Sequence, residues 1–151
     1  MQLWGVINLT PDSFYAGSRF DAAGAVSKAE EFLAQGAAMV DVGAESTRPG
    51  AQPVAAEVQT ERIVQFIAGV KSALGEAALA RISVDTRDIA VMRPVLAAGI
   101  RCINDVSGGS NEIFRLIAEY NAEYVLTHSQ GTPQTMQLSP AYADVLGEVK
   151  G

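Results

Sequence analysis

The sequence predicts an α/β fold in which helices cover a parallel β-sheet. Short apolar runs alternate along the chain with longer stretches in which apolar residues recur at helical spacing. The apolar runs are hydrophobic throughout, which is typical of strands buried on both faces of a parallel sheet. A third observation concerns position, because polar, chemically capable residues gather where several of these runs end.

The expected elements alternate over the whole chain, which we interpret as a single domain spanning residues 1–151. Strands are predicted at 3–9, 39–43, 82–85, 100–106 and 123–127. Helices are predicted at 21–34, 53–74, 88–98 and 111–120, with a last helix from Ser139-Pro140 to Gly151. In the helix at 53–74, the residues expected to face inward are Val58, Ile63, Phe66, Ile67 and Val70.

Composition excludes several classes of protein. The chain has 151 residues, 48% hydrophobic and 19% charged, which is typical of a globular domain with a real core. A net charge of −6 argues against binding to a nucleic-acid backbone. The lone Cys102 is expected to be a reduced core residue. We expect a cytoplasmic protein, because no apolar run reaches the roughly 20 residues of a membrane span and no signal peptide is visible.

Two parallel architectures compete: an open doubly wound sheet and a (β/α) TIM-barrel. The open sheet usually has a glycine-rich phosphate loop after its first strand, and residues 8–12 are not such a loop. In a barrel the functional groups lie at the carboxyl ends of many strands. This chain fits that pattern, with Asn8, residues 45–48, Asp85, residues 104–105 and His128. We therefore predict an incomplete TIM-type barrel with about five of eight β/α units, since a full barrel needs about 250 residues.

Five motifs occur in order along the chain and at suitable separations. They are Asn8-Leu9-Thr10-Pro11-Asp12-Ser13-Phe14, Glu45-Ser46-Thr47-Arg48-Pro49-Gly50, Ile82-Ser83-Val84-Asp85-Thr86, Ile103-Asn104-Asp105-Val106 and His128-Ser129-Gln130-Gly131-Thr132-Pro133. Together these motifs resemble the dihydropteroate synthase family, the sulfonamide target of folate synthesis. The resemblance covers essentially the whole chain but only the first part of the family's barrel.

The resemblance implies a transferase that condenses 6-hydroxymethyl-7,8-dihydropterin diphosphate with p-aminobenzoate to give 7,8-dihydropteroate and diphosphate. It also implies a homo-oligomer. The family's later aspartate, lysine, arginine and histidine lie beyond Gly151, so little or no turnover is expected from residues 1–151 alone. An arylamine is already a nucleophile at neutral pH, so no residue is assigned as a general acid or base.

The resemblance also implies roles for individual residues. Asp85 and Asn104 would hold the amino-pyrimidinone edge of the pterin, and Val106 would form an apolar wall. Asn8 would bind a Mg²⁺ ion that neutralises the leaving diphosphate. The loops that cover diphosphate and p-aminobenzoate would use Thr10, Asp12, Ser13, Phe14, Ser46, Thr47, Arg48 and Pro49. Ala16 stands where many family members carry an acidic residue.

Each motif taken alone has a plainer interpretation. Residues 85–88 could simply cap the next helix, and residues 104–105 could form an ordinary turn. Arg48 taken alone resembles a surface ion-pair partner. Asp41 is interpreted as structural, and the region around Met136 and Tyr142 as helix packing, while His128 is left out of the chemistry.

Two other functions compete with the synthase. One is a non-catalytic pterin- or diphosphate-binding paralogue, which turnover of the two substrates would distinguish from the enzyme. The other is a methyltetrahydrofolate-dependent methyltransferase domain, which cobalamin-dependent methyl transfer would reveal. The loops at residues 11–14 and 48–49 argue against the methyltransferase, because a methyl donor has no diphosphate to cover.

Overall fold

The sheet is parallel and its strands follow one another in sequence order. A computed structural model describes residues 1–10, 22–45, 53–128 and 141–150. The sheet order is β1-β2-β3-β4-β5, and every neighbouring pair is parallel. The strands are β1 (Trp4–Asn8), β2 (Met39–Gly43), β3 (Ile82–Asp85), β4 (Cys102–Asp105) and β5 (Glu123–Leu126).

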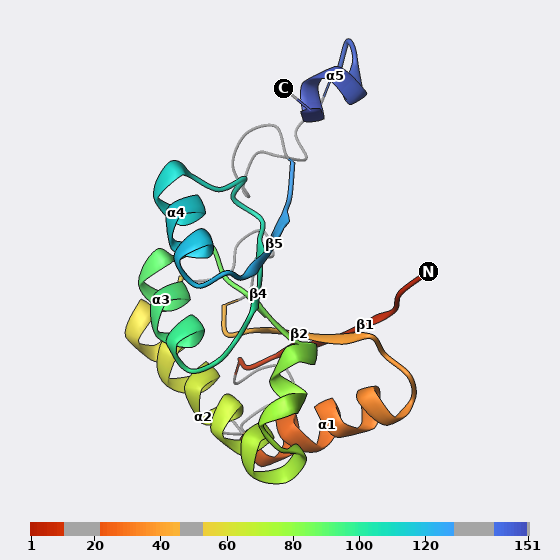
Figure 1. Cartoon of the computed structure of the whole chain (residues 1–151), viewed down its shortest axis with the longest axis vertical. Coiled ribbons are helices and arrows are strands. Elements are labelled where there is room, and N and C mark those ends of the chain that lie inside the picture. Colours follow the sequence, from red (N-terminus) through yellow and green to blue (C-terminus); the bar gives the residue numbers. More distant parts are fainter. Residues whose placement is uncertain (11–21, 46–52, 129–140, 151) are drawn as a thin grey trace.

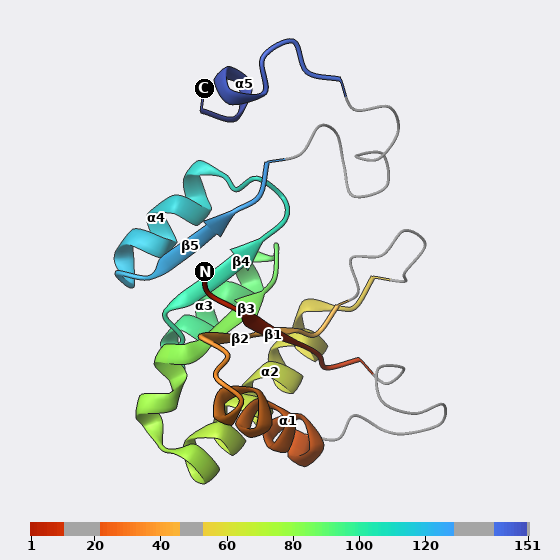
Figure 2. The ribbon, with the colours of Figure 1, turned by 90° about the vertical axis from the view of Figure 1, so that its right-hand side faces the viewer.

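Four helices connect consecutive strands and lie on the same side of the sheet (Figure 1). They are α1 (Ala22–Ala34), α2 (Ala56–Leu74), α3 (Ile89–Ala97) and α4 (Asn111–Glu119). We call the opposite side of the sheet the inner face; Figure 2 looks toward this side. A doubly wound sheet would reverse its strand order and carry helices on both faces. The observed order and one-sided cover confirm the barrel-type prediction over five β/α units.

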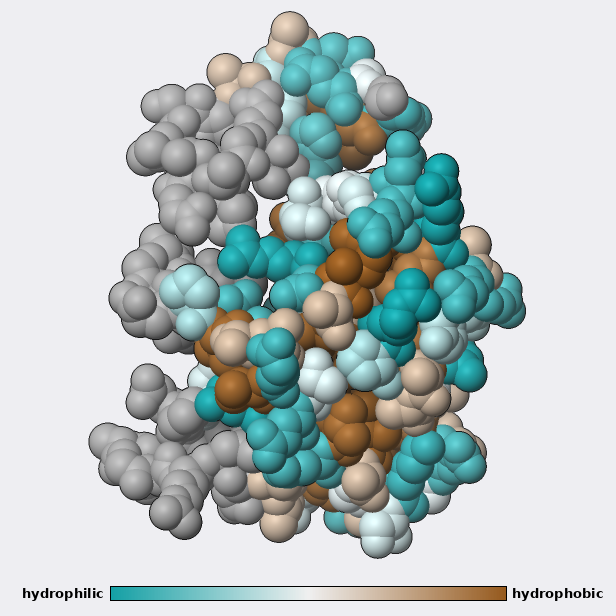
Figure 3. Space-filling model, turned by 90° about the vertical axis from the view of Figure 1, so that its left-hand side faces the viewer, coloured by the Kyte–Doolittle hydropathy of each residue, from teal (hydrophilic) through white to brown (hydrophobic). Residues whose placement is uncertain are grey.

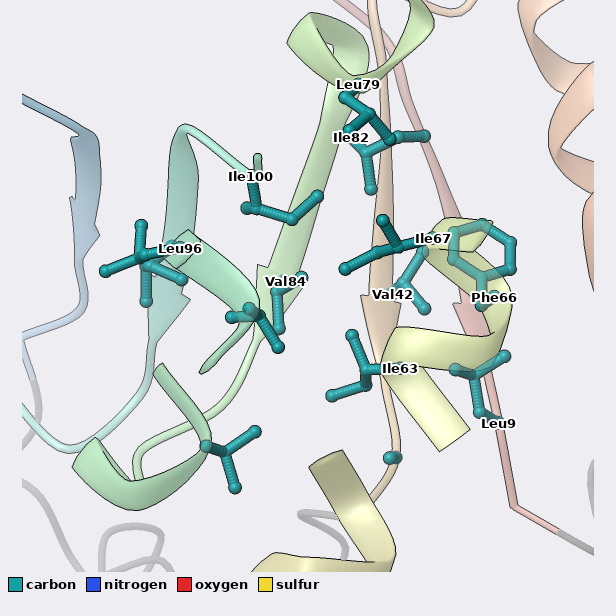
Figure 4. Packing of buried hydrophobic residues seen from close by; sticks show 14 of the residues in the cluster. Leu9, Val42, Ile63, Phe66, Ile67, Leu79, Ile82, Val84, Leu96 and Ile100 are labelled. Atoms are coloured by element: carbon teal, nitrogen blue, oxygen red, sulfur yellow. The ribbon is translucent and has the colours of Figure 1, made fainter. Parts of the chain in front are cut away.

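The hydrophobic core lies between the sheet and these helices. Val42 and Val84 project from β2 and β3 toward Ile63, Phe66 and Ile67 of α2 (Figure 4). All five side chains are at most 2% exposed. The outer side of the helices carries hydrophilic residues between smaller hydrophobic patches, as Figure 3 shows. The core therefore positions the strands, and their carboxyl ends carry the polar residues.

The prediction that Val58 faces inward is wrong. Val58 is 38% exposed, and its neighbour Gln59 is buried at 4% exposed. The inward stripe of α2 runs through Ile63, Ile67 and Val70, and four residues before Ile63 is position 59 rather than 58. The Gln59 Nε2 atom donates a 2.8 Å hydrogen bond to the Val54 carbonyl, so its buried amide is partnered.

Two further elements differ from the prediction. A 3₁₀ helix, η1 (Glu76–Arg81), precedes β3 and was not predicted. The last helix, α5 (Val145–Lys150), starts later than Ser139-Pro140, since residues 141–144 are described and are not helical. The backbone N–H groups of Ala143 and Asp144 donate to Glu148 Oε1, which satisfies them outside the helix. None of the α5 residues is buried, and α5 lies apart from the sheet (Figures 1 and 2).

The helices of the described ranges are all too short or too polar to cross a bilayer.

Helix α3 begins at a side-chain cap, because Asp88 Oδ1 accepts a 2.8 Å hydrogen bond from the Ala90 N–H. Cys102 is a free, buried thiol, as expected.

The two valines of α2 provide a matched test of this packing. Val70→Ala should lower the free energy of unfolding by about 1.5–3 kcal/mol, because it leaves a cavity at a fully buried position. Val58→Ala should change it by less than about 0.5 kcal/mol. Urea denaturation of both variants measures the difference. Equal losses would show that the face of α2 has been assigned wrongly.

Candidate functional site

The strand register places three of the predicted site residues in one row across the sheet. Residues along a strand alternate between faces, and Ile7, Val42, Val84 and Ile103 are buried beneath the helices. The residues after them therefore face the inner side, at the carboxyl end of the strands. In register, this end row consists of Asn8, Gly43, Asp85, Asn104 and Val125.

Gly43 leaves room for Asp85 within the end row. A Cβ atom built on Gly43 would lie 3.4 Å from Asp85 Oδ2, in van der Waals contact with this carboxylate, so a glycine here keeps the space beside it open. Asn8 is exposed, Asp85 is half-buried, and both flank Gly43 in register. Across β1, β2 and β3 the row therefore presents the amide of Asn8, the open space beside Gly43 and the carboxylate of Asp85, in that order.

Asn104 makes a hydrogen bond to a carboxylate that sequence reasoning interpreted as structural. Its Nδ2 atom donates to Asp41 Oδ2 at 2.9 Å. Asp41 lies in the row just below, with Val6, Ser83, Cys102 and Glu123 in register. The sequence did hold a signal for Asp41, because a carboxylate inside an apolar strand is rarely buried without a partner.

Burial and neighbouring carboxylates raise the pKa of Asp85 from 3.8 to about 6. Desolvation of the carboxyl is the main cause, and repulsion from Asp41, Asp105 and Glu45 adds to it. The Asp85 carboxyl is therefore ionised at neutral pH but lies close to its titration point. Such a carboxylate is suited to accept hydrogen bonds from a ligand that carries N–H donors.

The capping interpretation of residues 85–88 is resolved by the geometry. Asp88 caps α3, while Asp85 is in the end row and takes no part in the cap. The turn between them is tied to the next strand, because the Thr86 N–H donates to the Asn104 carbonyl at 3.0 Å. Thr86 Oγ1 in turn accepts from the Asp88 N–H at 3.2 Å.

Asp105 faces the helices and does not belong to the end row. It is fully buried, and it accepts hydrogen bonds from Tyr124 Oη at 2.5 Å, Ser107 Oγ at 2.9 Å and Ser107 N–H at 2.6 Å. Burial, together with the hydrogen bond to Asp105, raises the pKa of Tyr124. Asp105 thus fixes the turn after β4, which includes the half-buried Val106.

The remaining predicted residues lie around the loop ends or outside the described ranges. Thr10 is half-buried just after β1. At the end of β2, Glu45 Oε1 accepts from the Val54 N–H at 3.1 Å, and Glu45 Oε2 lies 3.6 Å from Arg87 Nε. His128 is exposed, and its ring centroid lies 5.7 Å from that of Tyr142. The predicted loop residues that lie outside the described ranges are Asp12, Ser13, Phe14, Ser46, Thr47, Arg48 and Pro49.

Within the described ranges, no group of three or more His, Cys, Asp or Glu side chains could hold a metal ion. Asn8 contributes a neutral amide oxygen at an exposed strand end. Such an oxygen suits a hard cation that takes its other ligands from phosphate oxygens and water.

The raised pKa of Asp85 predicts a specific loss of stability with pH. The folded state holds this proton more tightly than the unfolded chain, so the stabilisation is complete below pH 3.8 and disappears as pH rises through about 6. The expected loss is roughly 1–3 kcal/mol. Carboxyl ¹³C NMR should show a midpoint near 6 that is missing in Asp85→Asn. Asp88→Asn, which keeps a capping side chain, should retain it; a midpoint near 4 would contradict the prediction.

Several curated and solved proteins similar to this chain are named dihydropteroate synthases. A family model described as pterin binding enzyme matches residues 4–151. A dihydropteroate synthase of Neisseria meningitidis is 40% identical, over 98% of this chain and 52% of its own length. The structure of dihydropteroate synthase from Clostridium difficile, in the presence of pteroic acid, superimposes with a TM-score of 0.82 at 30% identity. It matches 99% of this chain and 54% of that one.

The dihydropteroate synthase of Yersinia pestis, solved as a sulfonamide drug complex, gives a TM-score of 0.78 at 34% identity, over 99% of this chain and 54% of that one. The chain thus spans about half the length of the curated relatives it matches. The family model, the identity to these relatives and the shared barrel-type architecture lead to one conclusion. This chain belongs to the pterin-binding enzyme family.

Proposed function

We propose that residues 1–151 form a single pterin-binding domain of a dihydropteroate synthase. In this proposal the enzyme condenses 6-hydroxymethyl-7,8-dihydropterin diphosphate with p-aminobenzoate, giving 7,8-dihydropteroate and diphosphate. The observation that carries the proposal is the end row, which brings Asn8, Asp85 and Asn104 to one edge of the inner face. A homo-oligomer in the cytoplasm is part of the same proposal.

The end row matches the pterin ring in chemistry and in scale. The amino-pyrimidinone edge of a pterin presents several N–H donors close together. Asp85 and Asn104 are in register on neighbouring strands, which lie about 4.8 Å apart. An ionised Asp85 can accept a hydrogen bond from one N–H donor of the pterin, and Asn104 can accept from a second. Removal of either side chain would leave a polar group of the ligand without a hydrogen bond. Val106 would form an apolar wall beside the ring.

The diphosphate would lie toward Asn8, at the far end of the row from Val125. Mg²⁺ bound there would neutralise the negative charge that develops on the leaving group. Thr10, together with Asp12, Ser13, Phe14, Ser46, Thr47, Arg48 and Pro49, would cover diphosphate and p-aminobenzoate. The residues of this chain would thus bind and orient both substrates, and the aromatic amine would attack without a general base.

The two edges of the sheet support a role as part of a larger assembly. β1 and β5 are the edge strands, and each exposes apolar side chains: Val6 is 61% exposed and Leu126 is 56% exposed. Exposed apolar strands at sheet edges are normally paired or covered. We propose that further barrel strands or a second copy cover them in the active enzyme.

The first test is calorimetric titration with 6-hydroxymethyl-7,8-dihydropterin diphosphate, with and without Mg²⁺. Asp85→Asn should weaken binding by about 1–3 kcal/mol, because a ligand donor loses its carboxylate acceptor. Asp88→Asn makes the same chemical change three residues away and should bind like the wild type. Equal affinity of all three proteins would contradict the proposed site.

The second test is turnover by residues 1–151 alone. We expect ligand binding but little or no dihydropteroate, because the resemblance assigns a lysine, an arginine and a histidine to later strands. Product formation with p-aminobenzoate is measured beside the enzyme of Neisseria meningitidis as a positive control. Robust turnover by residues 1–151 would contradict this expectation, and cobalamin-dependent methyl transfer would favour the methyltransferase instead.

A further inference from the structure

Asp41 is a buried carboxylate that the proposed function has not used. It faces the inner side of the sheet, one row below Asp85 and Asn104, yet it is only 7% exposed. None of the ion pairs in the described part of the chain includes it. Within that part of the chain, its Oδ1 atom has no hydrogen-bond partner.

A purely structural role explains this arrangement poorly. A buried carboxylate without a cation costs stability, and an apolar residue of similar size would fill the same space at a lower cost in free energy. The one hydrogen bond that Asp41 does make is specific, because Oδ2 accepts from Asn104 Nδ2 at 2.9 Å. Its partner is a residue of the proposed pterin site.

We propose that Asp41 is a positioning residue that fixes the orientation of the Asn104 side chain and thereby selects ligands with a hydrogen-bond donor. An amide that donates its NH₂ group to a carboxylate oxygen is held in that orientation, because a flip would place its carbonyl oxygen against the acceptor oxygen of Asp41. The Asn104 carbonyl oxygen is thus left free to accept from a ligand.

This orientation defines the chemistry of the preferred ligand, and the inference rests on the proposed function. Asp85 and Asn104 both become acceptors, side by side in the end row. They match a ring edge with adjacent N–H donors, such as the 2-amino group and ring N–H of a pterin. The 2-oxo analogue of the same bicycle would place a carbonyl against these acceptors and should be rejected. If Asp41 were removed, Asn104 could turn and donate to that carbonyl.

The test is calorimetric titration of the whole chain with 6-hydroxymethyl-7,8-dihydropterin diphosphate and with its 2-oxo analogue. The wild type should prefer the pterin by roughly 10- to 100-fold. Asp41→Ala should lose most of this preference, and the double variant Asp41→Ala/Asn104→Ala should bind no worse than Asn104→Ala alone. Ser83→Ala, which removes a buried hydroxyl from the same row, should keep the preference.

Asp41→Asn separates orientation from folding. Asparagine keeps the size of the side chain, but its amide can turn and donate to the Asn104 carbonyl oxygen, so it no longer fixes the orientation of Asn104. This variant should therefore lose most of the preference even if Asp41→Ala does not fold, and a retained preference would contradict the proposed role. Side-chain amide NMR of the ligand-free wild type gives a second readout. One Asn104 Nδ2 proton should be shifted downfield and protected from exchange, and the assignment follows from its loss in Asn104→Ala.

The failures are distinguishable. If the wild type does not bind the pterin diphosphate, or if Asp85→Asn binds it equally well, the proposed function fails and this inference fails with it. If the wild type binds and Asp85→Asn weakens binding, the function stands. Three results would then overturn the role of Asp41 alone. They are an unchanged preference in Asp41→Ala, additive losses of affinity in the double variant, and an Asn104 side-chain amide that exchanges like a solvent-exposed one.

Discussion

Parallel strand register is the constraint on which the arrangement of polar groups depends. Five strands pair in sequence order, so residues separated by many positions along the chain come into one row. Asn8, Asp85 and Asn104 lie in register near the carboxyl ends of their strands and on the same face. The packing of α2 against β2 and β3 fixes this register, because a shift by one residue would turn Val42 and Val84 out of the core.

The inner face has an electrostatic cost that a ligand could offset. Asp41 and Asp85 face the same side, with Asp105 and Glu45 near enough to raise the pKa of Asp85 further. In the described part of the chain, Arg87 pairs with Glu45, and Asp41 and Asp85 have no ion-pair partner. A ring edge rich in N–H donors would relieve this repulsion without carrying a full positive charge. The same excess of acceptors explains why the site should discriminate against ligands with a carbonyl at that edge.

Several details were beyond sequence reasoning for identifiable reasons. On α2 the buried position is Gln59 and not the neighbouring Val58. The spacing of apolar residues cannot predict this, because it does not show that the Gln59 side chain donates a hydrogen bond to the Val54 carbonyl. The late start of α5 depends on which backbone N–H groups the Glu148 side chain accepts from, and this contact forms only in three dimensions. Asp105 and Asn104 share one sequence motif, yet strand alternation sends their side chains to opposite faces, one toward Tyr124 and the other toward Asp41.

The sequence by itself determined the alternation of strands and helices, the parallel barrel-type sheet and the strand ends that carry Asn8, Asp85 and Asn104. These follow from local patterns, since apolar runs and helical spacing reflect burial within one element at a time. Only the tertiary structure decided that Asp41 contacts Asn104, 63 residues away, and that burial among carboxylates holds the pKa of Asp85 near 6. The contact between Asp41 and Asn104 and the raised pKa of Asp85 both depend on strand pairing, which brings carboxylates from different segments together in one buried, low-dielectric region. No single segment of the sequence reveals this arrangement.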